Sequence, residues 1–292
     1  MALTPSRTSS LFSSLPVLSL LLMLTPLPLP LTVTDQMDRR VAVPFPPQRI
    51  VSLVPSQTEL LFDLGLGERV VGVTKFCIHP TQARQAARVI GGTKNFHFDT
   101  INELQPDLIL GNKEENYQEG IEQLAAQFPV WMSDISTLAE ALDMIRRVGL
   151  ITGRKEAAEV LAAAIGTSFA GLALTSELIP AAYFIWRQPY MVAAAGTFID
   201  DMLRRAGFRN VFGHLGRYPE ITPEQLHAAA PRQILLSSEP YPFGEKHVTE
   251  FQQLCPEATV RVVDGELFSW YGSRLRYSVE YFRGLQSVAR TV

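Results

Sequence analysis

Five clusters of polar and aromatic residues each come directly after a predicted strand. Aromatic rings offer a large, stiff contact surface to a planar or bulky ligand, and arginines bind carboxylates or phosphates through paired hydrogen bonds. Carboxylates suit amide or ammonium donors or a hard metal. An open α/β sheet places its binding loops where its strands end. The clusters span residues 75–80, 112–117, 186–190, 239–243 and 268–274.

We interpret residues of these clusters as the lining of one ligand site. The turn after the first strand adds Pro55 and Ser56 to them. Any one of these side chains also fits core packing or a solvated rim, but five clusters at strand ends favour a binding site. The candidates are Pro55, Ser56, Lys75, Phe76, His79, Asn112, Lys113, Glu114, Trp186, Arg187, Tyr190, Glu239, Tyr241, Trp270, Tyr271 and Arg274.

Alternating strands and helices position the first clusters. Apolar, β-rich runs of strand length alternate with helical patterns, which predicts an α/β lobe with a parallel sheet. A short helix begins near Thr58, and another starts at Asp99, which we expect to be its N-cap. Strands are predicted at 40–43, 50–54, 70–73, 107–111 and 129–132, and helices at 58–62, 99–104 and 117–128.

A helical connector follows, and then a second lobe. Strand patterns are absent from 137 to 175, and the alanine-rich run after Gly153 predicts a long helix from Lys155 to Leu174. Beyond it, the segment 222–237 repeats the order of 99–111: a short helix, a proline and a buried strand. Two such lobes leave a cleft between them. We therefore divide the chain into a leader (1–34), an N-terminal lobe (35–136), a connector (137–178) and a C-terminal lobe (179–292).

Composition and the N-terminus limit the possible partners and compartment. A net charge of −3 gives no electrostatic footprint for nucleic acid. The two cysteines, Cys77 and Cys255, make no disulfide framework, and we expect free buried thiols. The leucine-rich run 11–31, with Arg7 ahead of it, predicts export through a secretory signal or a short membrane anchor. The alternative is a wrongly assigned start, with a cytoplasmic protein that begins near Thr32.

The order and spacing of four segments resemble the solute-binding proteins of ABC importers. These segments are 49–74, 99–111, the mid-chain helix and 217–226, and the resemblance extends from about Gln48 to the C-terminus. More narrowly, the segments resemble the class in which a rigid helical backbone joins the lobes. This class includes vitamin B12-binding and iron-siderophore-binding proteins. The resemblance implies two Rossmann-like lobes with central parallel sheets, joined by one long backbone α-helix, with the ligand in the cleft. It also implies a monomer without catalytic activity or an intrinsic cofactor, which delivers its ligand to a membrane permease and its ATPase.

The same resemblance assigns roles to individual residues. Phe76 and Tyr218 occupy positions where B12-binding relatives carry aromatic residues in the cleft. Asp99 and Glu224 match the acidic residues that dock onto arginines of the permease, although both also suit the positive end of a helix dipole. Asn112 stands where other relatives carry tryptophan. The implied ligand is therefore a corrinoid such as cobalamin, or an iron chelate or haem, with room for something smaller.

Two other functions compete with this interpretation. A direct transition-metal receptor needs converging histidines and carboxylates, but the five histidines are scattered, and only His79 could act, with Glu114 and Glu115. A chelatase or metallocofactor-handling enzyme could use Cys77, His79 and Glu114 as an acid–base set. The chain lacks GxSxG, a phosphate loop and a GxGxxG turn after a strand. We therefore expect a binding protein with no metal site of its own.

Overall fold

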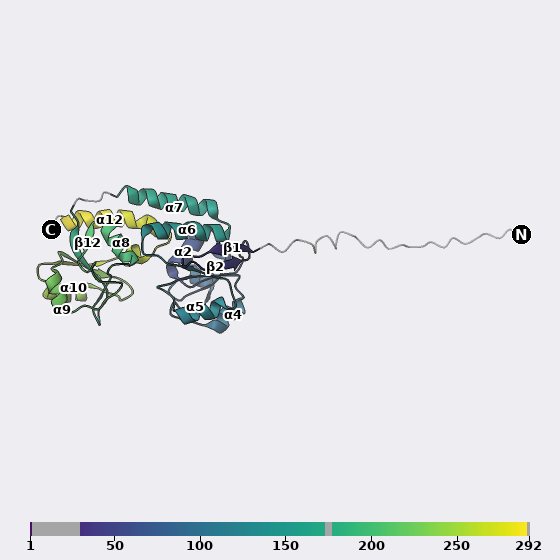
Figure 1. Ribbon diagram of the computed structural model, residues 1–292, viewed down its shortest axis with the longest axis horizontal. Helices are drawn as coiled ribbons and strands as arrows, with labels where there is room; N and C mark the ends of the chain where they lie inside the picture. The colour runs from purple at the N-terminus through teal and green to yellow at the C-terminus, as the bar shows by residue number, and fades with distance from the viewer. Residues whose placement is uncertain (2–29, 173–176, 291–292) are drawn as a thin grey trace.

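The computed structural model describes Met1, residues 30–172 and residues 177–290. Most of the leucine-rich run 11–31 lies outside these residues, as does Leu174, where the predicted long helix ends. The described chain forms two lobes joined on one side by helices, with the purple-to-blue first half in one lobe and the green second half in the other (Figure 1). Among the described residues, no helix has the length and apolarity to span a membrane.

The N-terminal lobe is built on a five-stranded parallel sheet in the order β5-β4-β3-β8-β9. The central strands β3 and β8 are buried along their whole length, as expected for a sheet that is covered on both faces. Gly72 of β4 allows close packing, because a Cβ there would meet Leu104, Val51 and Ile90. The strands are β3 (Ile50–Ser52), β4 (Val70–Val73), β5 (Arg88–Val89), β8 (Leu108–Asn112) and β9 (Val130–Ser133).

Helices and two small hairpins complete this lobe. The antiparallel β1–β2 hairpin includes Leu31–Thr34, which sequence analysis places in the leader. The Asp35 carboxylate holds the hairpin turn through the backbone amides of Met37 and Arg39. The elements are β1 (Leu31–Thr34), β2 (Arg40–Val43), α2 (Pro55–Asp63), η1 (Gly67–Arg69), α3 (Ala83–Ala86), β6 (Gly91–Gly92), β7 (Asn95–Phe96), α4 (Phe98–Leu104) and α5 (Gln118–Ala125).

The C-terminal lobe repeats this plan. Its parallel strands β12, β10, β13 and β14 take the positions that β4, β3, β8 and β9 take in the first lobe, and β11 adds an antiparallel edge. The strands are β10 (Ile179–Trp186), β11 (Met191–Val192), β12 (Phe208–Asn210), β13 (Gln233–Ser237) and β14 (Thr259–Val263). The helices are α8 (Phe198–Arg205), α9 (Pro223–Ala229), α10 (Glu245–Leu254), α11 (Glu266–Ser269) and α12 (Leu275–Arg290).

The repeat is closest between α4–β8 and α9–β13. Both helices have seven residues, and both end at a left-handed residue, Gln105 (φ 45°) or Ala230 (φ 44°), before a proline and a buried strand. Thr222 is the N-cap of α9, since its hydroxyl accepts the Gln225 amide. The predicted N-cap Asp99 is wrong. His97 is the capping residue and α4 starts at Phe98, so Asp99 lies inside the first turn, where a carboxylate still faces the helix dipole.

The connector contains two helices packed along each other, α6 (Leu138–Thr152) and α7 (Lys155–Ala170). Thr137 and Glu140 form a capping box at the start of α6. Burial raises the pKa of the Glu140 carboxyl, but hydrogen bonds from Ser136 and Thr137 outweigh it and lower the pKa overall. Gly153, in the left-handed region (φ 75°), reverses the chain into α7.

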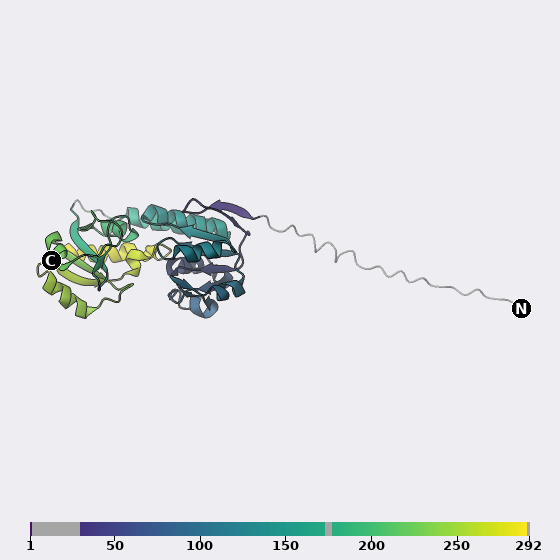
Figure 2. The ribbon, with the colours of Figure 1, turned by 60° about the horizontal axis from the view of Figure 1, so that its bottom comes forward.

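Helix α7 is the link between the lobes. Its N-terminal end is held to the N-terminal lobe where Arg154 donates to the Gly65 carbonyl at 3.2 Å. Its C-terminal end packs on the C-terminal lobe, where the Phe169 ring meets that of Phe282 on α12 at 6.3 Å between centroids. Figures 1 and 2 show α7 running along one side of the molecule from one lobe toward the other. The predicted fold class, two α/β lobes with parallel sheets and a helical backbone, is thereby confirmed.

Candidate ligand-binding site

The two sheets direct the carboxyl ends of their strands toward one shared region, here called the lobe interface. Glu114 follows β8 of the first lobe, and its carboxylate binds Arg217 and accepts the Tyr218 hydroxyl at 3.0 Å from the second. His79 follows β4, and its Nε2 lies 3.0 Å from the Glu266 carboxylate, which follows β14. Loops at strand ends from both lobes therefore meet, as predicted for the binding edge of this sheet type.

A cluster around Trp270 forms one part of the interface. The indole Nε1 donates to Glu239 at 2.9 Å, and the Ser269 hydroxyl donates to the same carboxylate oxygen at 2.7 Å. Burial raises the pKa of Glu239, and these two hydrogen bonds only partly oppose it. The Arg274 guanidinium lies 5.0 Å from the centroid of the indole ring, and the His79 ring meets its edge at 5.5 Å. Trp270 itself is buried, so it orients its neighbours more than it offers free surface.

Arg274 also ties the lobes together beside this cluster. Two of its nitrogens donate to the Glu59 carboxylate of α2, each at 2.9 Å, and a third lies 2.9 Å from Glu266. Burial raises the pKa of Glu59, while the hydrogen bond and charge of Arg274 oppose that rise. Gly272 presses against the Ser56 carbonyl, where a Cβ would collide. The predicted residue Ser56 is thus buried under the loop that carries Arg274, with Pro55 beside it.

Two aromatic residues at strand ends offer exposed surface. Phe76 follows β4 and is 49% exposed, with the Lys75 ammonium 5.0 Å from its ring centroid. Trp186 ends β10, is 40% exposed and meets the Tyr241 ring edge-on at 5.5 Å. They come from opposite lobes and from the carboxyl ends of the two sheets, so they are suited to contact a ligand held between the lobes.

Other predicted residues have partners within their own lobe. Arg187 and Tyr190 both bind the Glu250 carboxylate of α10, at 2.8 and 2.6 Å. Asn112 is buried, and its side-chain oxygen accepts the backbone amides of residues 114 and 115, which shapes the loop after β8. Lys113 pairs with Asp134 at 2.6 Å. These contacts stay within one lobe and hold the loops that follow β8 and β10.

Sequence reasoning missed several residues at the interface. The sequence pattern places Glu59 in an ordinary helix and does not single out Glu266 or Arg217. Arg217 has a positive φ of 63°, in the left-handed region that favours glycine. Asp264-Gly265-Glu266 directly follows β14, and that position alone could have marked Glu266. Glu115, by contrast, lies in the predicted cluster 112–117. Burial raises its pKa, and burial also raises the pKa of the Tyr218 and Tyr271 phenols.

The proposed acid–base set is dispersed. The Cys77 thiol is buried between the hydroxyls of Thr58 and Thr74, at 3.1 and 3.2 Å, and this burial raises its pKa. His79 is paired with Glu266, whereas Glu114 is paired with Arg217 of the second lobe. The three groups therefore have different partners. In the part of the chain that the structure describes, no three histidine, cysteine or acidic side chains converge on a metal position.

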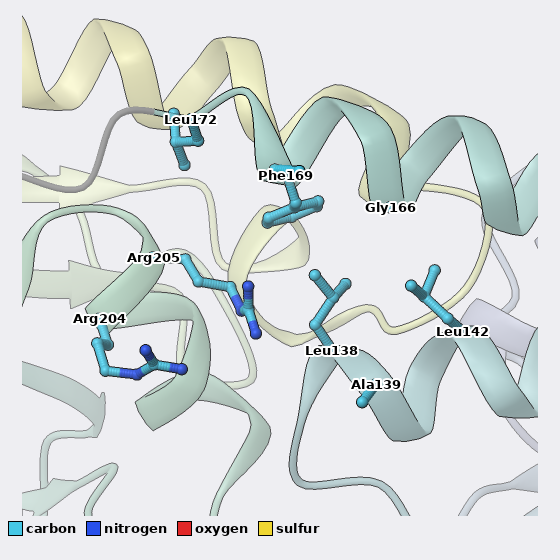
Figure 3. Close-up of a pocket in the computed structure, with 9 residues that line it drawn as sticks. Leu138, Ala139, Leu142, Gly166, Phe169, Leu172, Arg204 and Arg205 are labelled. Carbon is cyan, nitrogen blue, oxygen red and sulfur yellow. The ribbon is translucent and has the colours of Figure 1, made fainter.

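A cavity of about 340 Å³ lies elsewhere, among α6, α7 and α8. Figure 3 shows its apolar wall, with the guanidiniums of Arg204 and Arg205 at one side. Both arginines bind Asp201, which also accepts the first amide of α6, from Leu138, at 2.8 Å. Helices line this cavity and none of the predicted ligand residues does, so it is separate from the lobe interface.

Two α/β lobes that face each other with the carboxyl ends of their sheets, and that are linked by a helix on one side, define a protein that holds its ligand between lobes. The chain belongs to the periplasmic binding protein family, whose model matches residues 50–257.

Several relatives of known name or structure are similar over most of the chain. A vitamin B12-binding protein of Pectobacterium carotovorum is 28% identical over 236 residues, which cover 78% of this chain and 84% of the relative. A Bacillus subtilis ABC transporter substrate-binding lipoprotein is 25% identical, over 70% of this chain and 68% of its own length. The periplasmic vitamin B12-binding protein of Vibrio cholerae superimposes with a TM-score of 0.73 at 23% identity, over 85% of this chain and 100% of that structure.

Proposed function

We propose that this protein captures a corrinoid at the lobe interface and delivers it to the permease and ATPase of an ABC importer. Haem or a ferric chelate is the second ligand class. The observation that carries the proposal is the pair of exposed aromatic side chains, Phe76 and Trp186, at the carboxyl ends of the two sheets. The curated relatives named for vitamin B12, aligned over most of their length, support the corrinoid as the first choice.

The aromatic pair accounts for a measurable part of the affinity. An aromatic side chain buries on the order of 200 Å² when fully covered, and each of these rings has roughly half of that left to bury. At about 25 cal/mol per Å², each contact contributes on the order of 2 kcal/mol, or about 30-fold in Kd. A broad, stiff ring system of a metal chelate is the kind of ligand that could cover both rings at once.

Docking to the permease is assigned to Asp99 and Glu224. Each is exposed, and each is the second residue of its helix, α4 or α9, so the two lobes present an acid at equivalent positions. The Thr222 hydroxyl and the backbone amide of Glu224 lower the pKa of the Glu224 carboxyl, which keeps it charged. A pair of carboxylates on matching lobe tips suits a partner that presents basic side chains at two places.

We further propose export, with the leucine-rich run ahead of β1 as its signal, since a ligand supplier for an importer acts outside the cytoplasm. The family and the lipoprotein name of one relative support this location. The proposed units are the N-terminal lobe (35–136), to which β1 (Leu31–Thr34) is added by its pairing with β2, the connector (137–178) and the C-terminal lobe (179–292), and we propose that they act as a monomer.

A ligand panel tests the proposal. Purified protein is titrated with aquocobalamin, haemin and a ferric hydroxamate, and binding is read from the ligand absorbance that co-elutes on gel filtration. We expect the corrinoid to bind, and Phe76→Ala and Trp186→Ala each to weaken binding by about 30-fold. Tyr277→Ala is the matched control, because this ring is 51% exposed on α12 and follows no strand end. No binding of any of the three chelates would refute the proposal.

A further inference from the structure

The bonds that join the two lobes differ in depth. An inner group centres on Arg274, whose ion pairs with Glu59 and Glu266 involve side chains that are 10–17% exposed. An outer group centres on Glu114, which pairs with the 53% exposed Arg217 and accepts the Tyr218 hydroxyl at 3.0 Å. Exposed ion pairs are weak because water screens them, whereas breaking a buried pair is costly. The outer group is therefore the one that can open at low cost.

The inner group lies on the side of the helical link. Arg274 directly precedes α12, and α12 packs on α7 where the rings of Phe282 and Phe169 meet at 6.3 Å. Figure 1 shows α12 and α7 along the same side of the molecule. Arg276, in the first turn of α12, adds a second pair with Asp63 of α2 at 2.7 Å. Because the lobes are linked and doubly paired on this side, separation of the lobes begins at the outer contact.

Each half of the outer contact is fixed within its own lobe. The backbone amide of Glu114 donates to the Asn112 side chain at 2.9 Å, and the Lys94 ammonium donates to the Glu114 carbonyl. The backbone amide of Arg217 donates to the Ala195 carbonyl at 2.9 Å, which helps to hold Arg217 in the left-handed region at a φ of 63°. Both halves are thus preformed, so the contact closes or breaks as a unit when the lobes move.

A ligand between the lobes competes with this contact. Glu114 and Tyr218 are both candidate ligand residues, yet their side chains are bonded to each other across the interface at 3.0 Å. Each face of a flat ring needs about 3.5 Å to the atoms that cover it, so loops on its two sides stand about 7 Å apart. A broad ring therefore cannot lie between the two loops while the Glu114 contact is closed.

We propose that the contact of Glu114 with Arg217 and Tyr218 is a latch that keeps the ligand-free lobes together and opens to admit the ligand, while the Arg274 group stays closed. This proposal rests on the function proposed above and adds a gating step to it. The apparent Kd of a ligand that binds only the open form is raised by the reciprocal of the open fraction. One exposed ion pair and one hydrogen bond favour the closed form by about 5-fold to 10-fold.

The first test measures the distance between the lobes without ligand. Nitroxide labels are attached to Gln123→Cys on α5 and Thr249→Cys on α10, two exposed positions on opposite lobes and away from α7 (Figure 1). The native cysteines are buried. Pulsed electron paramagnetic resonance should give one short distance in the otherwise unchanged protein and an added longer one with Glu114→Ala. Arg88→Gln is the control, because its exposed pair with Glu103 lies within one lobe.

The second test titrates cyanocobalamin, which carries no net charge, into the unlabelled proteins by calorimetry. We expect Glu114→Ala and Arg217→Ala each to bind it about 5-fold tighter than the wild type, because both variants raise the open fraction. Salt from about 0.1 to about 1 M shortens the screening length from about 10 to about 3 Å. It should tighten binding by the wild type and the Arg88→Gln control, and leave binding by the two latch variants unchanged.

The two tests separate the latch from the proposed function. If the latch variants change neither the distances nor the affinity, the latch is wrong and corrinoid capture stands. If Glu114→Ala weakens binding while the distances stay as in the wild type, Glu114 holds the ligand directly and the latch is again overturned. If no corrinoid, haemin or ferric chelate binds, the proposed function is refuted, and a longer distance in Glu114→Ala would still establish the latch.

Discussion

The ion pair between Glu59 and Arg274 gives the strongest stability prediction. The two side chains are 10% and 13% exposed and make two bonds of 2.9 Å across the lobe interface. Loss of one partner of a buried pair costs about 3–5 kcal/mol, because an unpaired charge stays buried. Because both side chains keep some exposure to solvent, we take the lower end of this range and expect Arg274→Met to reduce the free energy of unfolding by about 3 kcal/mol. Removal of both partners should cost less than the sum of the single changes, with a coupling of about 2 kcal/mol.

A neighbouring pair supplies the control. Arg276 and Asp63 link the same two regions, α2 and the start of α12, at 2.7 Å, but their side chains are 38% and 27% exposed. Exposed pairs contribute below about 1 kcal/mol. Urea unfolding of both double-mutant cycles, followed by circular dichroism, gives the two coupling energies. A coupling for Glu59 and Arg274 no larger than that for Asp63 and Arg276 would refute the reasoning.

The pH dependence of the variant provides a second check. Burial raises the pKa of Glu59 above its ordinary value of 4.5, and loss of Arg274 removes the hydrogen bond and the charge that oppose this rise most strongly. A carboxyl with a raised pKa in the folded state binds its proton more tightly there than in the unfolded state. Stability then falls as pH rises through the interval between 4.5 and the folded-state pKa. The deficit of Arg274→Met should therefore be smallest below that interval and complete above it.

Three further predictions concern other parts of the molecule. Gly149→Ala should destabilise the α6–α7 pair by about 1–3 kcal/mol, because its Cβ would meet Ala158. Gly166→Ala has room beside Leu142 and should stabilise the pair by up to about 1 kcal/mol. Equal shifts of the two variants in thermal unfolding would contradict this. The pKa of Glu140 is lowered below its ordinary value of 4.5, so its contribution to stability is present above pH 4.5 and is lost as the pH falls through the folded-state pKa. Glu140→Gln should therefore lose less stability in acid than the wild type does. An unchanged dependence of stability on acid pH would argue against this. Asp99→Lys and Glu224→Lys should impair uptake in reconstituted vesicles while Kd for the ligand stays constant, and unimpaired uptake would remove their docking role.

Local patterns predicted the elements of the fold well. Val70–Val73 appears as a strand in both the sequence and the structure, and the two helix–proline–strand segments revealed the second lobe. Element ends were less predictable. The hydrophobic period shows that α4 exists, but a cap depends on backbone angles at one residue, and His97 rather than Asp99 has them.

The site was predictable in place and less so in chemistry. Strand ends marked where the loops meet, because topology follows from the alternation of elements. Arg274 looked free for a ligand in the sequence, since its partner Glu59 is 215 residues away and belongs to another lobe. Local pattern carries no information about such a pairing, and charge neutralisation at the interface could be recognised only from the folded arrangement.

The distribution of strands along the chain also has a consequence for the order of folding. The N-terminal sheet uses only residues 50–133 and the C-terminal sheet only residues 179–263, so each can complete from one contiguous stretch. During synthesis the first sheet can assemble while Arg274 is still to be made. The Glu59 carboxylate must then stay hydrated until the last helix begins to emerge. Joining the lobes is thus a late docking event between two preassembled sheets.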